Sequence, residues 1–228
     1  MGLTIHYQLK LAGAHKGMDD CQAKWAAEEL RKLALKFKRK RRFDAVGSLG
    51  FAPGERRLAM EWRMHRVAGQ LNAFTGEEIR PVAGHLFRVL VGRDCEPLLL
   101  GLCHYGRGGW RLKSFCKTQY AGLHGWEHFR RCHTAVIDLL AAAKSPGLMV
   151  KITDESDYWP GRDLNALRRN LDEMNAAVAA AAGVLKDVAE TGDGVPVQGP
   201  ILAHSQFERI EAEGEARGYA SRLRNVLK

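Results

Sequence analysis

The chain has 228 residues, 46% of them hydrophobic, and a formal net charge of +9 at pH 7. This length and apolar content suit one large domain with a real core and exclude intrinsic disorder. The longest apolar stretch, Ala176–Ala182, is too short to cross a bilayer, and the first residues lack the pattern of a secretory signal. We therefore expect a cytoplasmic protein with no membrane partner, whose five scattered cysteines are reduced thiols.

The charge is divided unevenly along the chain. Residues 1–151 contain 26 Lys and Arg against 13 Asp and Glu, a net charge of +13, whereas residues 152–228 contain 9 against 13, a net charge of −4. Basic surfaces attract polyanions, so the first two thirds of the chain suggest nucleic acid as a partner. Two other interpretations stay open: ordinary solubility charge, or docking of the acidic part onto the basic part.

Hydrophobic periodicity predicts the first elements. Leu3–Leu11 alternates apolar and other residues, as a strand with one buried face does. A helix then opens at Asp19-Asp20 and is expected to run to about Lys36, with acids at its start and bases at its end. Phe43–Phe51 is interpreted as a second strand, and Arg56–Ala68 fits either a strand or a helix.

The rest of the chain alternates strands and helices. The expected elements are a hairpin of Leu86–Val91 and Pro97–Cys103, a strand over Trp110–Tyr120, a helix over Trp126–Lys144, a strand over Leu148–Thr153, a long helix near 163–188 and a last helix opened by a capping box at Ser205–Glu208. This order predicts an α+β fold with a mixed β-sheet and helices mainly on one face. We expect one domain over residues 1–191, and a linker with a C-terminal helical appendage over 192–228.

Several segments resemble a known group of sequences. The opening MGLTIHY, the segment SFCKTQYA and the turn DESDYW are similar to those of an uncharacterised group of bacterial proteins, in the same order along most of the chain. The resemblance implies no activity, cofactor or fold. The basic run KFKRKRR is longer and more basic here than the corresponding link in that group.

The densest positive charge is the run Lys36–Arg42, which we interpret as a loop between helix and strand. Its cations are Lys36, Lys38, Arg39, Lys40, Arg41 and Arg42. Such a cluster binds phosphates by releasing their counterions, and the flanking Phe37 and Phe43 could stack on unpaired bases. Arg130 and Arg131 are candidates for the same nucleic-acid surface. The alternative is a solvated loop.

An acidic turn is the candidate for chemistry. Asp154, Glu155 and Asp157 follow a strand and precede the long helix, and carboxylate oxygens suit Mg²⁺. With that metal, a catalytic set could comprise Lys117, Gln119, His133, Asp154 and Glu155. The alternative is structural, because Asp157 or Asp163 could cap the free N–H groups of the long helix.

Cysteine and histidine residues also gather between residues 103 and 133. His124, His128 and Cys132 are spaced to share a helical face, but no CxxC pair accompanies them, so the pattern for Zn²⁺ is incomplete. Cys116 and Cys132 each have cationic sequence neighbours that would favour a thiolate nucleophile. Burial as small apolar residues is the alternative for both.

Three hypotheses of function follow. The leading one is nucleic-acid binding through the basic run. The second is a metal-dependent phosphoesterase or nuclease that uses the acidic turn. The third is a protein-interaction module in which acidic and basic surfaces meet. Neither a substrate nor an oligomeric state follows from the sequence.

Overall fold

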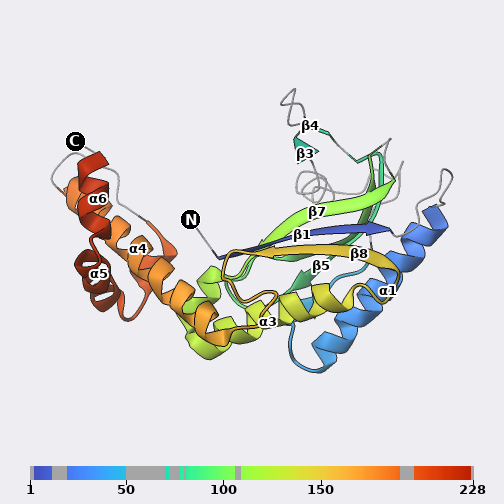
Figure 1. The fold of residues 1–228 in the computed structure, drawn as a ribbon, viewed down its shortest axis with the longest axis horizontal. Helices are drawn as coiled ribbons and strands as arrows, with labels where there is room; N and C mark the ends of the chain where they lie inside the picture. Colours follow the sequence, from blue (N-terminus) through green and yellow to red (C-terminus); the bar gives the residue numbers. More distant parts are fainter. Residues whose placement is uncertain are drawn as a thin grey trace.

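The computed structural model describes residues 3–11, 20–49, 70–71, 78–79, 81–105, 109–190 and 198–226 (Figure 1). Its centre is a six-stranded sheet with the order β2-β5-β6-β7-β1-β8. The strands are β1 (Thr4–Leu11), β2 (Ala45–Val46), β5 (Ala83–Leu90), β6 (Leu98–His104), β7 (Trp110–Lys117) and β8 (Leu148–Asp154). A separate two-stranded pair is formed by β3 (Gln70–Leu71) and β4 (Glu78–Ile79).

Every neighbouring pair of strands in the large sheet is antiparallel. The first strand of the chain lies in the interior of this sheet, because β1 pairs with β7 on one side and with β8 on the other. The α+β fold class is therefore confirmed, but the expected mixed sheet is wrong. Strands β7 and β8 do point in the same direction, but they are not hydrogen-bonded to each other because β1 lies between them.

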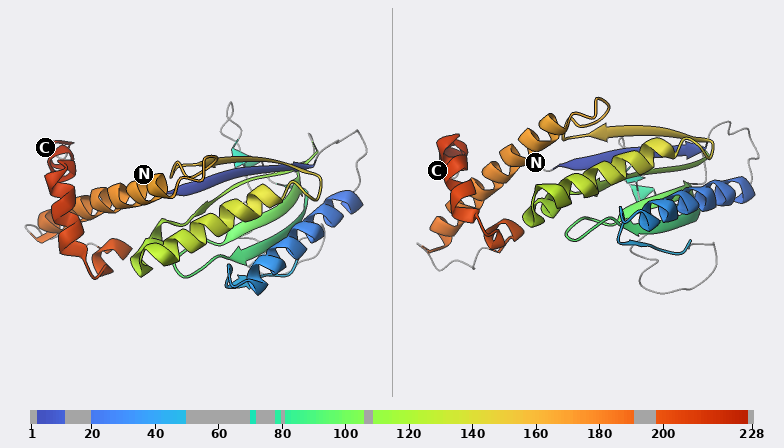
Figure 2. Two further views of the ribbon diagram at one scale, coloured as in Figure 1. Left: turned by 60° about the horizontal axis from the view of Figure 1, so that its bottom comes forward. Right: turned by 90° about the horizontal axis from the view of Figure 1, so that it is seen from below.

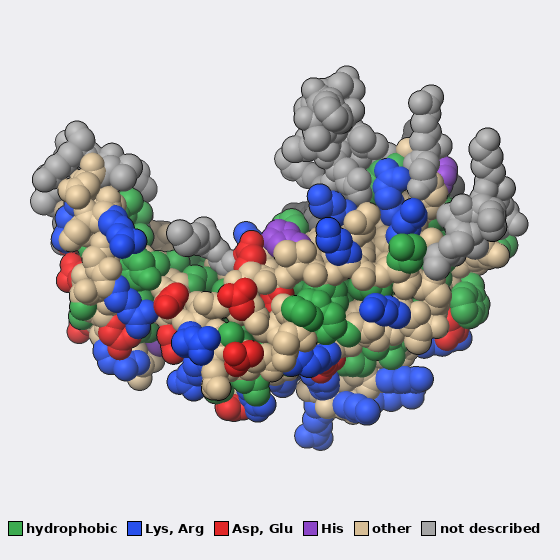
Figure 3. All heavy atoms as spheres, viewed as in Figure 1, with side chains coloured by type: hydrophobic (Ala, Val, Ile, Leu, Met, Phe, Trp, Pro, Cys, Tyr) green, Lys and Arg blue, Asp and Glu red, His purple; other side chains and the backbone are tan. Residues whose placement is uncertain are grey.

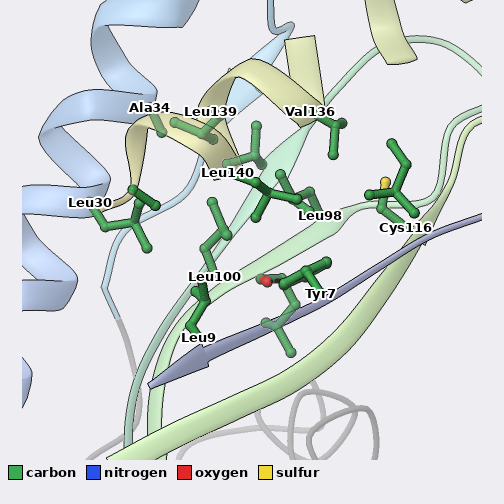
Figure 4. Close-up of a cluster of buried hydrophobic side chains, with 14 of the residues drawn as sticks. Tyr7, Leu9, Leu30, Ala34, Leu98, Leu100, Cys116, Val136, Leu139 and Leu140 are labelled. Carbon is green, nitrogen blue, oxygen red and sulfur yellow. Dashed lines mark hydrogen bonds between the residues drawn. The ribbon is translucent and has the colours of Figure 1, made fainter. Parts of the chain in front are cut away.

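Two helices cover one face of the sheet, as expected. They are α1 (Asp20–Arg39) and α3 (Trp126–Ala142), which lie side by side beneath the strands in Figure 2. The core between the layers is built from both helices and the inward positions of the strands, as the close-up shows (Figure 4). Leu9 and Leu100 from the sheet meet Leu30 from α1 there, and all three are fully buried. Each such side chain contributes about 1.5–3 kcal/mol of transfer free energy.

A helical extension leaves the sheet at its end. The long helix α4 (Leu164–Glu190) is confirmed, and η2 (Pro200–Ala203), α5 (Phe207–Ala216) and α6 (Tyr219–Val226) pack along it (Figure 1). Small residues allow this close packing, because a Cβ on Gly214 would lie only 2.1 Å from the carbonyl oxygen of Ala176. Among the described residues, no helix has both the length and the apolar character needed to cross a bilayer.

Some expected boundaries are wrong. Helix α1 continues to Arg39, so half of the basic run is helical rather than a loop. Within residues 43–49, the part of the predicted second strand that the structure describes, only the two residues of β2 are in a strand. The capping box does not form, because α5 begins at Phe207 after Gln206, which makes no side-chain cap. The segment Arg56–Ala68 lies outside the described residues.

Candidate nucleic-acid interface

A buried polar network lies where β7 and β8 meet α3. His133, on α3, has its Nδ1 2.8 Å from Thr118 Oγ1, and its Nε2 3.3 Å from the carboxylate of Asp154. Because a carboxylate only accepts, Nε2 carries the proton that it donates to Asp154. Ser156 completes the network, since its hydroxyl donates to the same carboxylate at 2.7 Å. The side chains of His133 and Asp154 have no solvent exposure at all.

The Asp154 carboxylate is held in its charged form by these donors. Burial alone would raise the pKa of this carboxyl, but the hydrogen bond and charge of His133, with the bonds from Ser156, outweigh burial and lower it. The backbone N–H groups of Ser156 and Trp159 also donate to it, at 3.0 and 3.1 Å. This arrangement fixes the turn after β8, and it leaves neither carboxylate oxygen facing solvent.

The other predicted catalytic residues lie at the same end of the sheet but do not enclose one concavity. Gln119 is buried, and its Oε1 accepts the backbone N–H of Leu3 at 2.9 Å. Glu155 lies at the surface, where it accepts from the N–H of Thr4 at 3.1 Å and pairs with His6 at 3.1 Å. The ammonium of Lys117 lies over the ring of Phe115. The five residues are thus divided between the core and the surface.

The acidic turn has the geometry of a structural turn. Asp163 caps α4, accepting from the N–H groups of Asn165 and Ala166 at 2.8 and 3.1 Å, as the capping alternative predicts. Asp157 instead accepts from Asn170 Nδ2 at 3.2 Å. Within the described part of the chain, no three His, Cys, Asp or Glu side chains are grouped so that they could hold a metal ion.

The basic run is split between exposed and engaged side chains. Lys36, Lys38, Arg39, Lys40 and Arg41 are exposed at the end of α1. Arg42 instead pairs with Asp138 at 2.7 Å. Of the two predicted arginines on α3, Arg131 donates to the carbonyl oxygen of Arg42 at 3.3 Å, and Arg130 pairs with Glu127.

The expectation that Phe37 and Phe43 could stack on bases is wrong for Phe43. The two rings stack on each other, with centroids 5.6 Å apart, and Phe43 is only 3% exposed. The guanidinium of Arg42 lies over the ring of Phe37, 5.2 Å from its centroid. The aromatic residues that flank the basic run therefore anchor it to the core.

A second basic surface lies on the face of the sheet that is turned away from α1 and α3. We call this surface, formed by the outward residues of β1, β7 and β8, the outer face. Its cations are Lys10, Arg111, Lys113, Lys117 and Lys151. The three strands contain one acidic residue, Asp154, and it is buried in the network described above. Lys and Arg side chains accordingly gather over these strands in Figure 3.

The cations of the outer face are placed close together by strand register. Lys10 lies directly opposite Arg111, and Gln8 lies between Lys113 on one side and Lys151 on the other. Like charges on directly opposed positions destabilise a sheet. Lys10, Lys113 and Lys151 are exposed, and within the described residues none of the three forms an ion pair. The register thus concentrates positive charge on this face of the sheet.

An exposed aromatic side chain lies beside these cations. Phe115 on β7 is 43% exposed, and its ring lies 6.1 Å from that of His6 on the neighbouring strand. A hollow of about 240 Å³ adjoins it, lined by Arg88, Glu96, Pro97, Leu99 and Phe115. The hollow combines an apolar wall with one cation, Arg88, and one carboxylate, Glu96. These groups could contact a planar ring that carries two or three polar substituents.

The outer face was not predicted as a site from the sequence. Its period-two signal is present, because Lys10, Lys113 and Lys151 occupy the polar positions of alternating strands. The missing information was which strands are neighbours. Comparison of the chain with protein-family models, with curated proteins and with solved structures finds no match.

Proposed function

We propose that this protein binds single-stranded nucleic acid on its outer face. The proposal rests on one observation: five cations on the outward positions of three adjacent strands lie on the same face of the sheet as an exposed phenylalanine. Proteins that bind single strands combine a basic track for the backbone with aromatic rings for the bases. An antiparallel sheet backed by helices on its other face is one platform for such contacts.

Each part of the surface has a role in this proposal. Lys10, Lys113 and Lys151 neutralise phosphates, and the register places Lys113 and Lys151 about 10 Å apart across β1. Phe115 stacks on a base that enters the adjacent hollow. Glu96, at the border of the hollow, can accept a hydrogen bond from an exocyclic amino group. A duplex offers no unpaired base to Phe115, so single strands are preferred.

The basic end of α1 is the weaker candidate for the same function. Its cations are equally exposed, and they form the lower group of Lys and Arg in Figure 3. However, Lys36, Lys38 and Arg39 lie in the last turn of α1. Cations there interact favourably with the negative end of the helix dipole, so their presence is explained without a ligand. The aromatic rings that flank them, Phe37 and Phe43, stack on each other rather than facing outward.

Two charge-matched variants test the choice of surface. One is Lys10→Gln, Lys113→Gln and Lys151→Gln; the control is Lys36→Gln, Lys38→Gln and Lys40→Gln, which removes the same charge from the end of α1. Binding of a labelled 12-nucleotide single strand is measured by fluorescence anisotropy across a series of salt concentrations. We expect the outer-face variant to reduce the slope of log K against log[salt] by about 2, at about 0.7 per phosphate contact.

A third variant separates stacking from charge. Phe115→Ala should weaken single-strand binding at least about fivefold without changing the salt slope, because stacking contributes about 1–3 kcal/mol per base. Its binding to heparin, a polyanion without bases, should stay unchanged. Loss of binding in the α1 control, with wild-type affinity in the outer-face variant, would overturn the proposal.

A further inference from the structure

The hollow beside Phe115 brings side chains of opposite charge together on an apolar floor. It has a volume of about 240 Å³, and its lining comes from three adjacent strands, with Arg88 on β5, Leu99 on β6 and Phe115 on β7. Glu96 and Pro97, which precede β6, complete the lining. Leu99 is only 2% exposed, whereas the ring of Phe115 is 43% exposed. The hollow therefore has one aromatic wall that a ligand can reach.

The carboxylate of Glu96 is held in place by the end of β7. The N–H of Glu96 donates to the carbonyl oxygen of Lys117 at 2.9 Å, and its own carbonyl oxygen accepts from Cys116 Sγ at 3.3 Å. In the side chain, Oε2 accepts the N–H of Lys117 at 3.2 Å. A carboxylate has about four lone-pair sites, so this bond leaves Oε1 and a second site on Oε2 for donors in the hollow. The acceptor is thus fixed before any ligand binds.

Arg88 supplies donors to the same hollow from the neighbouring strand. It is half-buried, and the register places it directly opposite Leu99. Within the described residues its guanidinium forms no ion pair, not even with Glu96. A guanidinium presents its N–H groups as a rigid fork that can bond two acceptors at once. The hollow therefore combines a fork of donors with a pair of acceptor oxygens, and neither satisfies the other.

The charges of the hollow favour a base over a phosphate as its occupant. A phosphate would be repelled by the carboxylate of Glu96, and the lysines of the outer face already offer it cations without such a neighbour. A base is neutral, it has donors on one part of its edge and acceptors on another, and its flat face can stack on Phe115. The carboxylate thus makes the hollow a place for reading a base rather than for binding the backbone.

The four bases differ in how well they satisfy both groups. Guanine carries two donors side by side, N1–H and the N2 amino group, and two acceptors, O6 and N7, on the adjoining part of its edge. In adenine and cytosine the amino group lies next to a ring nitrogen that only accepts, so one carboxylate oxygen would face a lone pair. Thymine and uracil have no amino group. Guanine is therefore the base that can pair two donors with the carboxylate and two acceptors with the guanidinium.

We infer that the hollow selects guanine in the single strands that the outer face binds, an assignment that rests on the proposed function. Glu96 accepts hydrogen bonds from N1–H and the N2 amino group, Arg88 donates to O6 and N7, and Phe115 stacks on the ring. The lysines of the outer face bind the backbone of any sequence, and the hollow adds the preference for one base.

The test compares labelled 12-nucleotide single strands built from repeats of thymine-thymine-X, with the full-length protein and fluorescence anisotropy as the measurement. X is guanine, adenine, cytosine or thymine, or one of two guanine analogues. We expect the guanine strand to bind at least about fivefold more tightly than the other three natural strands, since a bidentate contact discriminates by about that factor or more. Hypoxanthine, which lacks the N2 amino group, and 7-deazaguanine, which lacks the N7 acceptor, should each lose part of this preference.

Two variants assign the preference to its side chains. Glu96→Gln keeps an acceptor for the N–H of Lys117 but turns an amide donor toward the donors of guanine, so the guanine preference should disappear while the thymine strand still binds. Arg88→Lys keeps the charge and loses the fork, so guanine and 7-deazaguanine should bind equally well. Glu127→Gln, the matched control, makes the same chemical change at an exposed carboxylate on α3 and should keep the wild-type preference.

The outcomes separate the base preference from the function on which it rests. Equal affinity for every strand, with binding still weakened by Lys10→Gln, Lys113→Gln and Lys151→Gln together, would overturn the selection of guanine and leave single-strand binding standing. A guanine preference that persists in Glu96→Gln would also overturn it. If no strand bound, the proposed function would fail and the base preference with it. Circular dichroism shows that Glu96→Gln is folded, and the two guanine analogues test the same contacts on the unaltered protein.

Discussion

The buried carboxylate of Asp154 allows a stability prediction in which magnitude and sign are both fixed by the structure. Four donors point at it: the N–H and hydroxyl of Ser156, the N–H of Trp159 and Nε2 of His133. At about 1 kcal/mol for each lost hydrogen bond, Asp154→Ala should lower the free energy of unfolding by about 4 kcal/mol. Asp154→Asn keeps one acceptor oxygen, so about 2 kcal/mol is expected.

The matched control is Asp157→Asn, three residues further along the same turn. Asp157 is exposed and accepts one hydrogen bond, from Asn170 at 3.2 Å. Its φ of 58° is positive, a conformation that Asn adopts as readily as Asp. This variant should therefore unfold within about 0.5 kcal/mol of the wild type in urea, as followed by circular dichroism.

The pH dependence gives the prediction a second test. The pKa of Asp154 is lowered in the folded state, so its contribution is complete above the ordinary carboxyl range and is lost as pH falls through the folded pKa. The difference in free energy of unfolding between the wild type and Asp154→Asn should accordingly become smaller as the pH falls from about 7 to about 3. Equal stability of the two Asn variants, or a difference that is constant over this range, would refute the reasoning.

Three further predictions concern packing. Gly101→Ala should prevent folding or cost several kcal/mol, because its φ is +120° and a Cβ would lie 1.9 Å from the carbonyl oxygen of His85; soluble yield and circular dichroism measure this. Phe43→Ala should cost about 3–5 kcal/mol in urea unfolding, and more than Phe37→Ala, whose ring is only partly buried. Gly214→Ala should expose the C-terminal helices to limited proteolysis while the sheet domain stays resistant, since its Cβ would overlap the backbone of α4.

Local elements were predictable because their signals are local. The alternation of Leu3–Leu11 and the three-and-four spacing over 163–188 each reflect one apolar face, and both elements form as expected. The order of the strands was not predictable, since no local pattern shows that the first strand pairs with the two that follow much later. The error of a mixed sheet has this origin.

The candidate site shows the same division. A contiguous basic run such as Lys36–Arg42 is obvious in a sequence, yet its flanking Phe43 belongs to the core. The outer face draws one cation from each of β1 and β8 and three from β7, so its charge density exists only after folding. The spacing of its cations depends on the register between strands, and that register depends on pairing between distant segments.

The interior position of β1 has a consequence for how the chain assembles. Both strands that pair with β1 follow later in the chain, and the second of them ends at Asp154. The meander of β5, β6 and β7 is local in sequence, so we expect it to pair first. β1 can then pair with β7, and β8 completes the sheet by adding to the free edge of β1. Both pairings of β1 join segments far apart in the sequence, and such non-local closure slows folding.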